Sequence, residues 1–250
     1  MLRATLTLLG ITVTFACLCR PDIGHAQTYY VGTCHPGKSD YATIQKAVTN
    51  VPSGSTINIC PGNYPEQVTI QQPLTLKGIQ DGGSASVVVS APGGALSVPG
   101  VTTLYPLAAQ LQVINSGGPV NISGLTIDGT GLILPTSGPD FFAVSILYDS
   151  SPGTLDHVVS QNLRPANANV TGIVVLDDSS VSPPVTIQNS FLTMLSGGQS
   201  LYYTGIQASQ SAVLSVTNNY LSFFNGVDYY SVGFSPQPRV RARLPGTPSI

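Results

Sequence analysis

Two copies of the tripeptide Asp-Ser-Ser hold the carboxylates that could do chemistry in this sequence. They begin at Asp149 and Asp178, each five residues after an apolar residue, Val144 or Ile173, that looks equivalent in two neighbouring segments. Carboxylates stacked about 5 Å apart cannot both ionise easily, so either the pair acts as acid and base or a Ca²⁺ ion bridges it. Asp149 and Asp178 are therefore candidate catalytic residues and candidate calcium ligands.

Few other ionisable side chains lie near this pair. Arg164 is the only cation between Lys77 and the carboxyl-terminal end, and it is the third candidate catalytic residue. Asp177 and Asp156 are candidate substrate-binding residues. The alternative is that these aspartates form ordinary solvated turns without a function. His157 occupies a place where other segments have Gly or Asn, which favours a turn role over catalysis.

Aromatic residues gather in the last segments of the chain. Exposed aromatic faces can stack against sugar rings, and packing in the core or at the end of the fold is the alternative. Tyr202 and Tyr203 are candidate substrate-binding residues on this basis. The cluster comprises Tyr202, Tyr203, Tyr220, Phe223, Phe224, Tyr229 and Tyr230.

A repeat of about 30 residues must position these side chains. Each unit contains two short runs of alternating apolar and polar residues, separated by Gly, Ser, Pro and Asn. The first runs align at Leu111, Val144, Ile173 and Ile206, and the second at Ile122, Leu155, Ile187 and Val216. One unit cannot bury its own apolar face, so the repeat predicts parallel stacking of successive units into a β-solenoid.

The same alignment places Asn189 and Asn218 one above the other at a turn, with Gly124 and His157 at the corresponding places. Stacked amides can hydrogen-bond along the solenoid. Asn189 and Asn218 are therefore expected to form a structural ladder, in preference to a binding role.

Composition supports a β-rich fold and excludes some functions. Charged residues make up 8% of the chain and hydrophobic residues 42%, with a formal net charge of −2. This hydrophobic content is too high for a disordered chain. Without a basic stripe, the sequence predicts no nucleic-acid partner.

The amino-terminal residues 1–26 read as an export signal, with Arg3 before an apolar run and small residues before the expected cleavage site at Ala26. A retained membrane anchor is the alternative. After cleavage we expect a secreted or periplasmic monomer that does not bind a membrane. Cys34 and Cys60 then remain, and in an oxidising compartment they are expected to form a disulfide rather than a metal site.

A short helix near residues 40–51, N-capped by Ser39 or Asp40, is expected to close the open end of the solenoid. Its buried face would hold Ile44, Ala47, Val48 and Val51. The β-helix domain is expected to run over 27–235, and a Pro/Arg-rich disordered tail over 236–250.

The amino-terminal part also resembles a known family. The segments Asp40-Tyr-Ala-Thr-Ile-Gln-Lys-Ala-Val48, Pro61-Gly-Asn-Tyr-Pro-Glu-Gln-Val-Thr-Ile70 and Pro73-Leu-Thr-Leu-Lys-Gly78 are similar to the start of pectin lyase-like superfamily proteins, above all pectin methylesterases. The resemblance implies an all-β, right-handed parallel β-helix with a short amino-terminal capping α-helix. It covers residues 40–78 in detail and continues as a repeat pattern to about residue 230.

The resemblance bears on chemistry only in part. It implies a nucleophilic carboxylate, a second carboxyl group, an arginine and oxyanion-binding glutamines. Asp140-Phe-Phe142 and Leu163-Arg164-Pro165 are partial matches to the esterase motifs, while the family's Gln-Asp-Thr-Leu element and its tryptophan are missing. Superfamily lyases use calcium with an arginine base, so Ca²⁺ is the one cofactor that the resemblance suggests.

These observations favour a secreted β-helix protein that contacts extracellular polysaccharide, as a binding or catalytically diverged member of the superfamily. An active pectinesterase-like or polysaccharide-lyase-like enzyme acting on pectin-like glycans is the first alternative. A structural or adhesive surface protein is the second.

Overall fold

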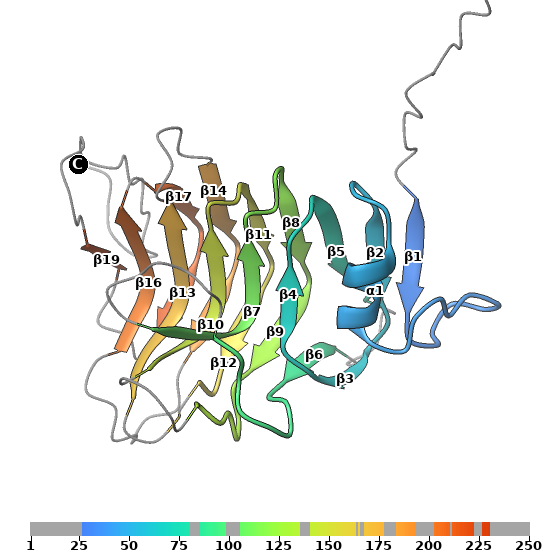
Figure 1. Cartoon of the computed structure of the whole chain (residues 1–250), viewed down its shortest axis with the longest axis horizontal. Helices are drawn as coiled ribbons and strands as arrows, with labels where there is room; N and C mark the ends of the chain where they lie inside the picture. Colours follow the sequence, from blue (N-terminus) through green and yellow to red (C-terminus); the bar gives the residue numbers. More distant parts are fainter. Residues whose placement is uncertain are drawn as a thin grey trace, which may run out of the picture.

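The chain folds into three parallel β-sheets that run side by side along one long axis, as Figure 1 shows. The computed structural model describes residues 27–80, 86–98, 106–135, 141–163, 165, 168–177, 184–193, 203–210, 212–222 and 227–230. Several predictions fall outside these residues: the export signal, the tail over 236–250, and the sites at Asp140, Arg164, Asp178 and Tyr202. The predicted all-β parallel β-helix with a short helix is confirmed.

Each coil contributes strands to the three sheets in the same order, and the sheets are numbered I to III in that order. Sheet I holds β1 (Thr28–Val31), β2 (Thr56–Ile59), β5 (Leu74–Gly78), β8 (Val120–Ser123), β11 (Gly153–Asp156), β14 (Pro184–Gln188) and β17 (Val213–Thr217). Sheet II holds β3 (Gly62–Pro65), β6 (Val87–Ser90), β9 (Leu125–Asp128), β12 (Val159–Gln161), β15 (Phe191–Thr193) and β18 (Tyr220–Ser222). Sheet III holds β4 (Val68–Ile70), β7 (Leu107–Ile114), β10 (Phe142–Asp149), β13 (Asn169–Asp177), β16 (Tyr203–Gln210) and β19 (Val227–Tyr230).

The predicted register is correct in sheet I and partly wrong in sheet III. In sheet I the expected residues Ile122, Leu155, Ile187 and Val216 are direct neighbours across the strands. In sheet III, Leu111, Ile173 and Ile206 also align, but the β10 residue between them is Ile146 and not Val144. Val144 and Ile146 are two residues apart, so both fit a pattern of alternating apolar residues read from the sequence. In the structure Ile146 packs in the main core, whereas Val144 packs in a separate apolar cluster.

This correction changes the alignment on which the predicted carboxylate pair rests. Asp149 lies beside Leu176 in the register, and the residue after Leu176 is Asp177. The alignment that paired position 149 with position 178 is therefore wrong, and the acid/base or calcium pair derived from it loses its geometric basis.

The core fills the space between the three sheets with aliphatic side chains from every coil. Tyr148 is the largest of the fully buried side chains, and its hydroxyl donates to the carbonyl oxygen of Val120 at 2.9 Å. Room for this ring comes from Gly153. A Cβ atom there would lie 2.0 Å from the Val120 oxygen and 2.8 Å from the Tyr148 ring.

The strands of sheet III bend where they approach sheet II. Gln110 is fully buried at this bend and donates from Nε2 to the carbonyl oxygens of Val89 and Asp128, at 2.9 and 3.1 Å. One coil further on, the Ser160 hydroxyl of sheet II donates to the Ser145 hydroxyl at 2.7 Å. Polar side chains at the bend thus tie the two sheets together.

The predicted capping helix is confirmed but is shorter than expected. Helix α1 spans Ile44–Asn50, and its predicted apolar face is buried. Its N-cap is Thr43, whose Oγ1 accepts from the amide of Lys46. The predicted caps Ser39 and Asp40 are wrong: the Asp40 carboxylate instead accepts from the amide of Tyr30 at 2.8 Å.

Glu66, which lies between β3 and β4, also caps this helix. Both carboxylate oxygens of Glu66 accept hydrogen bonds, one from the amide of Ile44 and one from that of Gln45, each at 2.8 Å. Tyr64, two residues earlier, donates its hydroxyl to the carbonyl oxygen of Cys60. In this chain the Gly62-Xaa-Tyr64-Xaa-Glu66 element therefore closes the end of the solenoid.

The predicted disulfide is confirmed between Cys34 and Cys60, whose Cα atoms lie 5.4 Å apart. It ties the loop after β1 to the end of β2, next to the capping helix. In the described part of the chain, no helix has the length and apolar character needed to cross a membrane.

Candidate functional site

The tight turn between sheets I and II repeats in successive coils and positions the side chains of interest. Its first residue has a left-handed backbone in four coils: φ is 66° at Gly124, 52° at His157, 50° at Asn189 and 55° at Asn218. Gly and Asn adopt this conformation most readily, which explains why the sequence repeats them at this place. The structure thus puts Asn189 and Asn218 at equivalent positions, as the alignment predicted.

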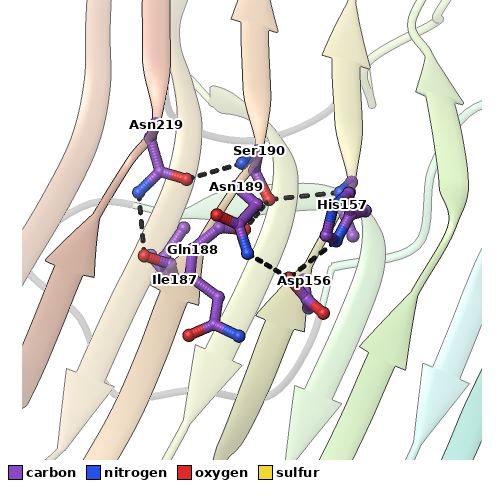
Figure 2. Close-up of polar contacts among 8 residues, drawn as sticks. Asp156, His157, Ile187, Gln188, Asn189, Ser190 and Asn219 are labelled. Atoms are coloured by element: carbon purple, nitrogen blue, oxygen red, sulfur yellow. Dashed lines mark hydrogen bonds and ion pairs between the residues drawn. The ribbon is translucent and has the colours of Figure 1, made fainter. Parts of the chain in front are cut away.

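The side chains at this turn form a hydrogen-bonded group, shown in Figure 2. Asp156 Oδ1 accepts from Asn189 Nδ2 at 2.9 Å and lies 2.8 Å from Nδ1 of His157. The Asn189 bond lowers the pKa of the Asp156 carboxyl, burial opposes this, and His157 lowers it further. The His157 side chain is 68% exposed and that of Asp156 31%. The amide of Asn189 therefore reaches back to a carboxylate.

A ladder bond does form along the solenoid, one residue further along the chain. The amide N–H of Ser190 donates to Asn219 Oδ1, and Asn219 Nδ2 donates to the carbonyl oxygen of Ile187, both at 2.8 Å. The Ser190 hydroxyl accepts from the amide of Val158. Ser190 and Asn219 are both buried, so this inner ladder fixes the turn that carries Asp156.

Two aromatic side chains stack on the outside of sheet II directly after this turn. Phe191 and Tyr220 are neighbours in the register of β15 and β18. Their ring centroids lie 4.6 Å apart with an interplanar angle of 7°, and the residues are 44% and 48% exposed. Among the described residues, β18 is the last strand of sheet II, and Phe191 lies on one side of Tyr220 only. The pair forms a rigid apolar platform open to solvent.

The polar group and the platform are parts of one surface, named here the corner surface and defined as Asp156, His157, Asn189, Phe191 and Tyr220. Backbone bonds hold the parts together: the amide of Phe191 donates to the carbonyl oxygen of Val158, next to His157, at 2.9 Å. An aromatic platform beside a carboxylate, an amide and an imidazole suits a ligand that has both apolar faces and many hydroxyl groups.

Sequence reasoning named Asp156 and His157 and placed Tyr220 among the aromatic residues, but it missed Phe191. The signal was present. The correct second-run alignment pairs Ile187 with Val216, and Phe191 and Tyr220 each follow four residues later.

The other predicted carboxylates lie away from this surface. Asp149 and Asp177 stand at the carboxyl ends of β10 and β13 in sheet III, and Asp177 is 1% exposed. Asp149 Oδ1 accepts from the hydroxyl of Ser150 at 3.1 Å. Within the described ranges, no three His, Cys, Asp or Glu side chains form a group that could hold a metal ion. Tyr203 begins β16, and its side chain lies outside the description.

The middle of the outer face of sheet III is apolar. Leu147 and Val174 are neighbours there, both at most 1% exposed, and they pack in a cluster separate from the main core. Ile146 and Tyr148, which flank Leu147 in the strand, point into the main core. At these positions the outer side of the sheet is therefore apolar and buried.

Asp128 is a further carboxylate with several partners, and sequence reasoning did not single it out. It accepts from the amide of Thr130 at 2.8 Å and from the side-chain amides of Gln161 at 2.8 Å and Asn162 at 3.1 Å. Burial by itself raises the pKa of Asp128, but these hydrogen bonds outweigh burial and hold the pKa below its usual range. The arrangement fixes the loop after β9 and is structural.

Comparisons with known proteins found similarity in structure only. No protein-family model and no characterised protein sequence matches it. A mutant pectin methylesterase in complex with a hexasaccharide is similar in structure, with 18% identity and a TM-score of 0.44, over 79% of this chain and 66% of that chain. The chain has a parallel β-helix fold. Pectin methylesterase from carrot aligns with 13% identity and a TM-score of 0.28, over 85% of this chain and 90% of that one.

The aligned part thus spans just under two thirds of the first structure's chain. At these identities the similarity concerns the β-helix alone, and the activity of either esterase is not carried over by it.

Proposed function

We propose that this protein is an extracellular β-helix protein that binds polysaccharide through the corner surface and does not catalyse its breakdown. The stacked, half-exposed pair Phe191 and Tyr220 is the observation that carries this proposal. Stacking on each other covers one face of each ring and leaves about half of each residue in contact with water. Sugar rings present C–H faces that pack against such aromatic surfaces, which removes apolar area from water.

The polar half of the surface supports the same function. Asp156, Asn189 and His157 offer hydrogen-bond acceptors and donors; Asn189 lies two residues before Phe191, and Asp156 and His157 belong to the preceding coil. The buried ladder of Ser190 and Asn219 holds their backbone in place, so little conformational entropy is lost when a ligand binds. The proposal therefore rests on a preformed surface.

An extracellular place fits the disulfide between Cys34 and Cys60, because such bonds persist in oxidising compartments. A binding role fits the apolar outer face of sheet III, where Leu147 and Val174 are buried. The separation of Asp149 from position 178 in the register also removes the geometric argument for an acid/base pair.

The test is a binding screen of the purified chain against immobilised plant and bacterial polysaccharides, repeated with Phe191→Ala and Tyr220→Ala. Loss of one stacked ring is expected to weaken binding about 2- to 10-fold. Val213→Ala is the matched control, because Val213 is an exposed apolar residue of sheet I at 41% exposure. It is expected to bind like the parent.

Thermal unfolding of each variant separates a binding defect from a folding defect. Absence of binding to every polysaccharide, or equal binding by all three variants, would count against the corner surface. Release of methanol or of unsaturated sugars from pectin by the purified chain would show instead that the protein is an enzyme.

A further inference from the structure

The described residues of the solenoid that surround the corner surface include no lysine or arginine. Among the described residues after Lys77, no lysine or arginine occurs, whereas Asp128, Asp149, Asp156 and Asp177 do. Within the corner surface itself, Asp156 is the acidic residue, and its side chain is partly exposed to solvent.

His157 does not change this balance. Its Nδ1 lies 2.8 Å from Asp156 Oδ1, so a protonated imidazolium would form an ion pair with that carboxylate and leave the pair without net positive charge. The remaining members of the surface, Asn189, Phe191 and Tyr220, are uncharged at neutral pH. Among the described residues, the polar group of Asp156, His157 and Asn189 is thus either neutral or negative overall.

We propose, building on the polysaccharide-binding function above, that the corner surface selects uncharged glycan chains and rejects polyuronates. A sugar stacked on the face of Phe191 that Tyr220 leaves free would lie toward the coil that carries Asp156 and His157. Hydroxyl groups there can donate to the carboxylate of Asp156, because an ionised carboxylate only accepts hydrogen bonds. A sugar carboxylate at the same place would meet a like charge, with no described cation to offset it.

The ligand chemistry has two natural sources: a polysaccharide built from neutral sugars, and a polyuronate whose carboxyl groups are esterified. Both present hydroxyl groups and apolar faces without charge. The probes that distinguish them are a neutral galactan, fully methyl-esterified polygalacturonate and unesterified polygalacturonate of the same length.

The experiment measures the affinity of the full chain for the three probes by calorimetry at pH 7, in low and in physiological salt. At least one uncharged probe is expected to bind at least about tenfold more tightly than polygalacturonate in low salt. The difference is expected to shrink as salt is added, because salt screens the repulsion between exposed charges.

Asp156→Asn identifies the source of the discrimination. This variant is expected to bind polygalacturonate several-fold more tightly than the parent, while its affinity for the uncharged probe stays within about threefold. Asp40→Asn is the matched control, since it removes the same charge at the opposite end of the solenoid, where Asp40 bonds to the backbone of Tyr30. It is expected to leave the ratio of affinities unchanged.

The outcomes separate this inference from the function on which it rests. Polygalacturonate binding that equals or exceeds that of the uncharged probes, and that still depends on Tyr220, would overturn the charge selectivity and leave the binding function standing. An unchanged ratio in Asp156→Asn would overturn the role of that carboxylate. Failure of all three probes, with a folded chain, would count against both.

Discussion

Removal of the Glu66 carboxylate should loosen the cap of the solenoid. This side chain accepts the amide hydrogens of Ile44 and Gln45 at 2.8 Å each, at the first turn of helix α1. A hydrogen bond to a charged group contributes about 1.5–3 kcal/mol, and the half-buried setting argues for the lower end of that range. We expect Glu66→Ala to lower the free energy of unfolding by about 3 kcal/mol. Glu66→Gln keeps one acceptor oxygen and should lose about half as much.

The measurement is a urea titration followed by far-ultraviolet circular dichroism, combined with hydrogen exchange at the amides of Ile44 and Gln45. Gln71→Ala serves as the control, because Gln71 is an exposed residue close to Glu66 in the sequence, and it should change stability by less than about 0.5 kcal/mol. The reasoning is refuted if Glu66→Ala stays within that margin, or if the two amides exchange at the parent's rate.

Three further predictions concern other parts of the fold. Gly153→Ala should destabilise by about 3 kcal/mol in a denaturant titration, since its Cβ would meet the Val120 carbonyl, whereas Gly94→Ala, with open space around it, should be neutral. Reduction of the Cys34–Cys60 disulfide should lower the free energy of unfolding by about 3 kcal/mol, and a midpoint insensitive to reductant would contradict this. The lowered pKa of Asp128 stabilises the fold above about pH 4, and this contribution is lost as pH falls through the folded-state pKa. Asp128→Asn should therefore be less stable than the parent at pH 7, and its stability should approach that of the parent in acid. A stability difference that does not change with pH would refute this assignment.

Sequence reasoning predicted the fold because the repeat constrains it twice. Alternating apolar residues mark the strands, and Gly or Asn marks the left-handed residue at the turn after sheet I. Both signals place Ile187 opposite Val216, and the structure agrees. The cap and the disulfide were predicted for similar reasons, since amphipathic spacing and a lone pair of cysteines leave few alternatives.

The register of β10 was mispredicted because sheet III lacks a comparable marker. Position 145 aligns with Gln110 of the preceding coil. The start of β10 has no Gly or Asn that recurs from coil to coil, so no turn residue fixes its register. From the sequence alone, Val144 and Ile146 fit the alternating pattern equally well, although in the structure Ile146 packs in the main core and Val144 packs outside it. The error moved Asp149 beside position 178 instead of Leu176.

The corner surface arises where the demands of the fold are weakest. Turn geometry requires a left-handed residue and a buried ladder residue, which Asn189 and Ser190 supply, but it places no demand on the side chains just before and just after them. The place just before the left-handed residue holds Asp156 in the coil of His157, where it accepts a hydrogen bond from Asn189, and the place after Ser190 holds Phe191, the start of the aromatic stack. Because the backbone repeats from coil to coil, such side chains are held at fixed spacing without any further scaffold. A recognition surface can therefore be built on this turn by substitutions that cost the solenoid little stability.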